Sequence, residues 1–141
     1  MAWLVKPVSR LAGRIAVPGS KSHTVRAVIA ALLSEKTSLI HAPLYSADTR
    51  SALNAVRSLG ADVKESGTLW QITGCGKNFT IPADPVDLGN SGTTMRIITA
   101  CAALAAEKIS FDGDASLRTR IMQGEVDADA QPLCWEQNIC R

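Results

Sequence analysis

Two glycine-containing turns in this sequence carry residue types that bind anions. The first reads PGSKSHTVR at residues 18–26, and the second reads DLGNSGTTMR at residues 87–96. A segment with helical periodicity follows each turn, so backbone N–H groups at a positive helix end would be free to bind phosphate or carboxylate. A lysine at a helix start costs about 0.3–1 kcal/mol unless an anion lies there too. We therefore predict that Lys21 and Arg26 face an anionic ligand.

A second interpretation is that both turns are ordinary helix caps with solvated cations beside them. Recurrence favours the anion site, because three residues repeat at a constant offset of 70 positions: Gly19, Thr24 and Arg26 recur as Gly89, Thr94 and Arg96. A nucleotide-binding loop fails on spacing, since the Walker pattern places lysine directly after glycine, whereas Lys21 follows Ser20. The sequence also lacks a G-x-G-x-x-G motif after a predicted strand, which argues against a dinucleotide site.

Hydrophobic spacing predicts the elements that position these turns. Before the first turn we expect a strand at 13–18, and after it a helix carrying Val25, Val28, Ile29, Leu32 and Leu33. A strand at 37–40, a helix with Asp48 as its N-cap and Gly60 as its stop, and a hairpin of 61–65 with 68–73 follow. The second turn lies between a brief strand at 86–88 and a helix at 91–106 that is apolar enough to be buried nearly all round, and a strand at 108–112 comes next.

This order indicates an α/β (α+β) fold built from repeated βαβαββ units. The first unit covers about residues 14–73, and the second, about 86–120, is incomplete. Both units lie within a first region, residues 1–120. The motif EKTSL at 35–39 recurs as EKISF at 107–111, which supports the repeat. Residues 121–141 lose this periodicity, so we expect a divergent tail that is disordered or frameshifted.

Composition restricts the possible partners. The 141 residues carry a net charge of only +2, which is too small to indicate nucleic acid, and no apolar run is long enough to predict a membrane span. The four cysteines form no CxxC pair, so we expect no metal site, reduced thiols and a cytoplasmic location. Charge is unevenly distributed, since the first 34 residues contain five cations and no acid, as a local anion site requires.

Three motifs, PGSKSHTVRA, DLGNSGTTMR and GDASLRTR, together resemble the N-terminal part of the EPSP synthase (3-phosphoshikimate 1-carboxyvinyltransferase) family. The resemblance implies a cytoplasmic transferase of the shikimate pathway, and thus of chorismate and aromatic amino acid biosynthesis. Its partners would be shikimate 3-phosphate and phosphoenolpyruvate, with no cofactor, no nucleic acid and no membrane. It also implies the enolpyruvyl transferase fold, in which this chain would hold about two of six βαβαββ units.

The resemblance also assigns the site. Lys21 matches the family's catalytic lysine, which reaches both substrates, and Ser22 and Arg26 match residues that hold the shikimate moiety. The residues matched to phosphoenolpyruvate binding, where the herbicide glyphosate competes, are Asn90, Ser91, Gly92, Thr93 and Arg120. We give His23 no catalytic role, and we expect Arg96 and Arg118 to form ion pairs near the site.

Members of this family are much longer than these 141 residues, and we expect the second domain, which would supply the acid and base for proton transfer, to be absent. By residue type alone, Glu107, Asp112 and Asp114 are candidates. We expect a truncated, frameshifted or split enzyme, which would act by self-association or with a missing second-domain partner. The alternative is a catalytically inactive fragment or binding module that holds shikimate 3-phosphate or another small anion.

Overall fold

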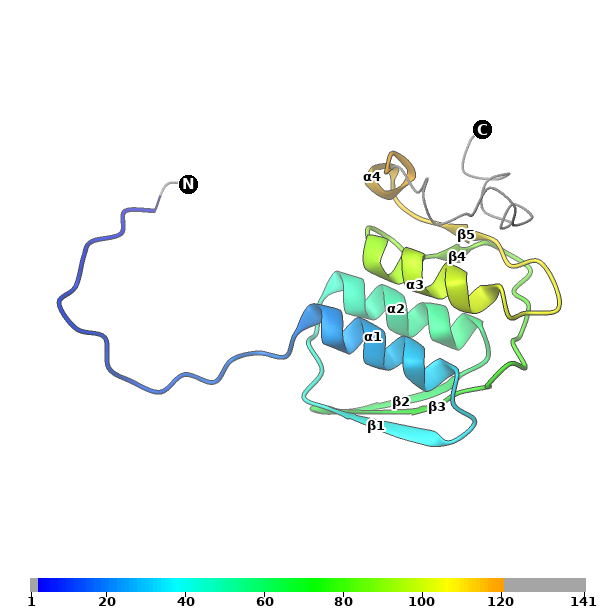
Figure 1. Ribbon diagram of the computed structural model, residues 1–141, viewed down its shortest axis with the longest axis horizontal. Coiled ribbons are helices and arrows are strands. Elements are labelled where there is room, and N and C mark those ends of the chain that lie inside the picture. Colours follow the sequence, from blue (N-terminus) through cyan, green and yellow to red (C-terminus); the bar gives the residue numbers. More distant parts are fainter. Residues whose placement is uncertain (1–2, 121–141) are drawn as a thin grey trace.

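The computed structural model describes residues 3–120, in which helices pack on an antiparallel sheet. The sheet contains β1 (Thr37–His41), β2 (Asp62–Ser66) and β3 (Leu69–Thr73) in the order β1-β3-β2. The central strand β3 pairs with both neighbours in one register, in which Ile72 lies opposite Ser38 and Val63. The helices α1 (Lys21–Leu32) and α2 (Ala47–Ser58) lie on one face of this sheet (Figure 1).

The second half of the described chain forms a smaller layer on the other side of the helices (Figure 1). Here β4 (Val86–Asp87) and β5 (Phe111–Asp112) form a parallel pair. The helix α3 (Gly92–Ala102) connects them, and the short helix α4 (Ala115–Arg118) follows β5. The chain is therefore a mixed helix-and-strand protein, in which a helical layer is covered by one sheet on each side.

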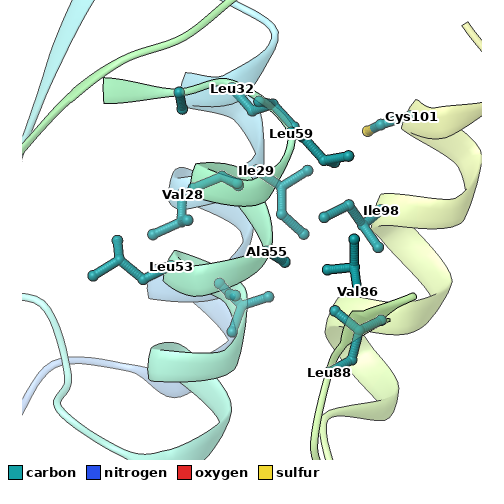
Figure 2. Close-up of a cluster of buried hydrophobic side chains, with 14 of the residues drawn as sticks. Val28, Ile29, Leu32, Leu53, Ala55, Leu59, Val86, Leu88, Ile98 and Cys101 are labelled. Atoms are coloured by element: carbon teal, nitrogen blue, oxygen red, sulfur yellow. The ribbon is translucent and has the colours of Figure 1, made fainter. Parts of the chain in front are cut away.

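The core lies where the three long helices meet (Figure 2). Because buried positions on α1 and α2 recur every three or four residues, each helix presents one continuous apolar stripe to its neighbours. Trp70 and Ile72 of β3 cover this stripe from the three-stranded sheet, and Val86 and Leu88 approach from the other side. The fully buried aliphatic residues on the helices are Val25, Val28, Ile29, Leu32, Ala52, Leu53, Ala55, Val56 and Ile98.

Several sequence predictions are confirmed by these elements. The spacing located both α1 and α2, except that Leu33, predicted on the apolar face of the first helix, is its C-cap and is 40% exposed. Gly60 ends α2 with a φ of +105°, a conformation that L-residues with a side chain rarely adopt. The predicted hairpin is present as β2 and β3, with Gly67 at φ +52° in its turn. Local periodicity and turn chemistry were sufficient for these elements.

The predicted strand at 13–18 is wrong. Residues 3–18, which we call the N-terminal arm, form no helix or strand and run away from the folded body (Figure 1). Ile15 is 83% exposed and Val17 is 80% exposed. A strand requires a neighbour to accept its backbone hydrogen bonds, and no described strand lies beside the arm. The arm therefore has a strand-like sequence without a strand partner.

The predictions for the second half are wrong in extent. The helix expected at 91–106 ends at Ala102, and it is not buried all round, since Arg96 and Ala100 are exposed. It packs on α1 and α2 with one side, and Ile97 and Ala102 are only partly buried against the core. The strand expected at 108–112 is reduced to β5, because only its last two residues pair with β4. The predicted tail at 121–141 lies outside the described residues.

Among residues 3–120, no helix is both long enough and apolar enough to cross a membrane.

Candidate functional site

Both predicted turns lie at one end of the helical layer. The helices α1, α2 and α3 run side by side and begin at the same end, where the N-terminal arm leaves the body and α4 lies (Figure 1). Contacts link the three helix starts. Lys21 Nζ of α1 lies 2.6 Å from Asp48 Oδ2 of α2, and a Cβ built on Gly89 would lie 3.0 Å from Ser51 Oγ of α2. The N-terminal part of α2 therefore lies between the two glycine-containing turns that the sequence predicted to bind anions.

The first turn is held by Ser20, which is the N-cap of α1. Its Oγ accepts a hydrogen bond from the backbone N of His23 at 3.4 Å. Lys21 begins the helix with its side chain about half exposed, Ser22 is partly buried, and Arg26 is exposed one turn later. These three predicted residues thus lie on the first two turns of one helix.

Asp48 is not the N-cap of α2, as the sequence had predicted. Ser46 occupies that position in a capping box with Thr49, in which Ser46 Oγ accepts from Thr49 N at 3.3 Å and Thr49 Oγ1 accepts from Ser46 N at 2.9 Å. Asp48 is consequently free to reach Lys21 as its counterion. The Ser-x-x-Thr spacing was the signal that could have shown this.

The second turn brings Asn90, Gly92 and Arg120 together. Arg120 Nη2 donates a hydrogen bond to Asn90 Oδ1, and a Cβ added to Gly92 would lie 2.7 Å from Arg120 Nη1. The guanidinium thus lies directly over the glycine at the start of α3. Thr93 is partly buried next to it. An arginine from 30 positions along the chain therefore supplies the positive charge of this turn.

Ser91 differs from the other predicted ligands because it is buried. Its exposed fraction is 1%, and its Oγ lies 2.7 Å from Thr94 Oγ1, which is also buried. It stands at the N-cap position of α3 but makes no side-chain cap hydrogen bond. In this conformation its hydroxyl stabilises the turn and does not point to a ligand.

Two further arginines were predicted to form ion pairs near the site. Arg118 Nε donates to Asp112 Oδ1 at 2.8 Å, which confirms the ion pair predicted for this residue. The hydrogen bond from Arg118, assisted by Gly113 N, lowers the pKa of Asp112, and the same pair raises the pKa of Arg118. The carboxylate of Asp112 is therefore held in its charged form. The other arginine, Arg96, is exposed on α3.

Asp114 joins the predicted second turn to α4, a link that sequence reasoning missed. Its Oδ1 accepts from Leu117 N at 2.8 Å as the N-cap of α4, and its Oδ2 accepts from Asn90 Nδ2 at 2.9 Å. The D-x-x-L spacing could have indicated the cap. The contact with Asn90 joins positions that are 24 residues apart, and no local signal marks it.

A cavity of about 240 Å³ lies beside the first turn. It is lined by the start of α1 and the end of β1, including Ser20, His23 and His41. The predicted binding residues of this turn, Lys21, Ser22 and Arg26, do not line it. In the part of the chain that the structure describes, no group of three or more histidine, cysteine or acidic side chains could hold a metal ion.

Comparison with known proteins identifies related sequences. The family model described as EPSP synthase (3-phosphoshikimate 1-carboxyvinyltransferase) matches residues 5–130. A 3-phosphoshikimate 1-carboxyvinyltransferase of Methanothermobacter thermautotrophicus is 47% identical over 128 residues, which cover 91% of this chain and 30% of that protein. One of Halobacterium salinarum is 47% identical over 113 residues, covering 79% of this chain and 26% of that protein.

Solved structures show the same likeness. EPSP synthase from Acinetobacter baumannii superimposes with a TM-score of 0.70 at 32% sequence identity, covering 78% of this chain and 26% of that one. A second structure of the enzyme from that organism gives a TM-score of 0.73 at 30% identity. This chain therefore spans less than a third of the length of each of these relatives and solved structures.

Proposed function

Since this chain belongs to the EPSP synthase family, we propose that it forms one half of a site that transfers the enolpyruvyl group of phosphoenolpyruvate to shikimate 3-phosphate. The observation that carries the proposal is the convergence of two helix starts, each with a cation, at one end of the helical layer. Both substrates are multiply anionic, and helix N-termini with lysine or arginine bind such groups well.

In this proposal each turn binds one substrate. Lys21, Ser22 and Arg26 on the first two turns of α1 bind shikimate 3-phosphate, and Lys21 also reaches phosphoenolpyruvate. The second turn binds phosphoenolpyruvate, where the lack of a side chain at Gly92 lets the guanidinium of Arg120 lie close to the start of α3. Asn90, Ser91 and Thr93 form the wall of that half-site. Arriving phosphate oxygens would replace Asp48 as the partners of Lys21.

The acidic residues of this chain near the second turn are poorly placed to transfer the protons that the reaction needs. Addition of the shikimate hydroxyl to phosphoenolpyruvate needs a proton donor to the methylene carbon, and elimination of phosphate then needs a base. Arg118 holds Asp112 in its charged form by lowering its pKa, so Asp112 is a poor proton donor near neutral pH. Both carboxylate oxygens of Asp114 already accept hydrogen bonds. We propose that the acid and base come from a second-domain partner.

The N-terminal arm supports a proposed partner. It exposes Trp3, Leu4 and Leu11 by almost nine-tenths each, and burying such side chains is worth about 25 cal/mol per Å². We propose that a second-domain partner, or failing that a second copy of this chain, covers the arm. The other candidate function is a binding module without turnover.

The test is titration of the ¹⁵N-labelled chain with shikimate 3-phosphate, alone and with phosphoenolpyruvate, followed by NMR. Shifts should cluster at the starts of α1 and α3. Lys21→Met should weaken binding about 10- to 100-fold, because a charge-assisted hydrogen bond is lost. Lys36→Met, at an exposed position after α1, is the matched control and should bind normally.

Two outcomes decide between the candidate functions. Phosphate release from the two substrates by the chain alone would contradict the need for a partner. Binding without release fits both candidates, so the C-terminal part of a relative is then added: restored turnover would confirm the half-site, and continued lack of turnover would support the binding module. If Lys21→Met binds as well as the unmodified chain, the anion site at the first turn is wrong.

A further inference from the structure

One acidic side chain ties both parts of the second half-site together. Asp114 Oδ2 accepts a hydrogen bond from Asn90 Nδ2 at 2.9 Å, and Asn90 Oδ1 in turn accepts from Arg120 Nη2. We propose that Asp114 is a positioning residue, which fixes the amide of Asn90 and thereby holds the guanidinium of Arg120 over Gly92 before a ligand arrives.

The proposal rests first on the polarity of the hydrogen bonds. An ionised carboxylate only accepts, so Asn90 can approach Asp114 only with its NH₂ group. The carbonyl oxygen of the same amide must then point the other way, toward Arg120, which only donates. Each partner therefore excludes the flipped amide. A neutral amide at position 114 would remove this constraint, because it could donate as well as accept.

The second support is that Asp114 also positions the backbone that carries Arg120. Its Oδ1 caps α4 at Leu117 N, and its backbone N donates to Gly89 O at 2.9 Å. Arg120 follows directly, with its backbone N bonded to Leu117 O at 3.1 Å. One residue thus fixes both the neighbour that Arg120 contacts and the short helix after which it stands.

The consequence for binding rests on the proposed function, in which Arg120 meets the anionic groups of phosphoenolpyruvate. An exposed arginine loses side-chain entropy when it is ordered by a ligand. A guanidinium that is already held loses less, so binding becomes tighter. Asp114 need not touch the ligand for this effect.

The test uses the substitution Asp114→Asn, which is nearly isosteric. Its side-chain oxygen can still cap α4, but its NH₂ group now faces the NH₂ group of Asn90. The direct readout is the side-chain ¹⁵N–¹H spectrum of Arg120, in which a held guanidinium rotates slowly. We expect slow rotation in the unmodified chain and fast rotation in Asp114→Asn. Affinity for phosphoenolpyruvate, measured with shikimate 3-phosphate present, should fall about 5- to 10-fold.

Two further variants separate positioning from general stability. Asp112→Asn is the matched control, because it breaks the neighbouring pair with Arg118 without a contact to Asn90, and it should leave the Arg120 signals unchanged. The exchange Asn90→Asp with Asp114→Asn restores a donor opposite an acceptor, so slow rotation of Arg120 should return. Affinity is not the readout of this exchange, since it moves a negative charge toward the ligand.

The proposal is overturned if the Arg120 guanidinium rotates freely in the unmodified chain, if its signals are the same in Asp114→Asn, or if the exchange variant folds without restoring them. Failure of the proposed function gives a different result. The unmodified chain would then not bind phosphoenolpyruvate, while the Arg120 signals would still respond to Asp114.

Discussion

The two turns reach a similar chemistry by different routes. In the first turn the cation, Lys21, belongs to the helix that the turn begins, and Asp48 holds it from the next helix. In the second turn the cation, Arg120, comes from beyond α4 and contacts the neutral amide of Asn90. In the first turn, an anionic ligand must therefore replace Asp48 as the partner of Lys21. In the second turn, the amide of Asn90 holds Arg120 without neutralising its positive charge.

The same contrast holds for Arg50, which lies 70 positions before Arg120, the same offset that relates Gly19 to Gly89. Arg50 Nη1 lies 2.8 Å from both oxygens of Glu65, and Glu65 also accepts from Arg57 Nη2 at 2.8 Å. A carboxylate on β2 therefore neutralises Arg50. Two arginines at matched positions differ in role because one meets a carboxylate and the other an amide.

The largest difference between the turns is expected from Gly19→Ala and Gly89→Ala. A Cβ at Gly19 would lie 2.6 Å from Ala42 O and 3.0 Å from Leu44 N, so backbone must move. We expect a loss of at least about 3 kcal/mol in the free energy of unfolding. Gly89, at φ +55°, meets only the movable Ser51 Oγ at 3.0 Å, and a loss of about 1–2 kcal/mol is expected. Equal losses in urea denaturation would mean that the turns are equally constrained.

A smaller difference is expected from the two serines at the N-cap positions. Ser91→Ala removes the hydroxyl that the buried Thr94 contacts, which should cost about 1–2 kcal/mol. Ser20→Ala removes a long, exposed cap bond and should cost about 0.5–1 kcal/mol. Chemical denaturation of both variants measures the order. The reverse order would show that Ser20 is the more important residue for its turn.

Asp48→Asn tests whether the counterion of Lys21 is structural. The pair is partly exposed, so its loss should lower stability by less than about 1 kcal/mol. Lys21 is then free of a competing carboxylate, and affinity for shikimate 3-phosphate should rise about 2- to 5-fold. Asp62→Asn, on exposed β2, serves as the control. A fall in affinity would instead indicate that Asp48 holds Lys21 in its binding position.

The smallest effect is expected from pH. A hydrogen bond from Arg57, followed by that from Arg50, lowers the pKa of Glu65. Because the folded-state pKa is depressed, the stabilisation is present above the unfolded pKa and is lost as pH falls through the folded one. Thermal unfolding between about pH 6 and pH 3 should therefore show a decline that Glu65→Gln reduces, by under about 1 kcal/mol. An unchanged pH slope in Glu65→Gln would show that this cluster contributes nothing to acid stability.

The sequence predicted what local spacing controls. Val25 and Ile29 lie on the apolar stripe of α1, and the hairpin formed around Gly67. The family resemblance selected Asn90, Gly92 and Arg120, and these residues meet although 30 positions separate the outer pair. Whether they bind a substrate stays a prediction.

The errors arose where the outcome depended on a distant partner. Ile15 and Val17 alternate as a strand would, but a strand exists only where another strand accepts its hydrogen bonds. Ser46 and Asp48 could each cap α2. The choice between them was decided by Thr49 within the helix and by Lys21, which is 27 positions away. Capping rules consider only residues near the helix start, so they cannot include the contact between Asp48 and Lys21.

The place where the N-terminal arm joins the body would affect how the proposed partner is captured. The arm meets α1 at Gly19 and Ser20, immediately before Lys21. Its 16 residues can extend to about 50 Å, so a partner bound at its far end would still be tethered to the helix starts. Once a partner binds the arm, its effective concentration near the two turns rises to the millimolar range. A weak contact between this chain and the proposed partner would then be sufficient to complete the site.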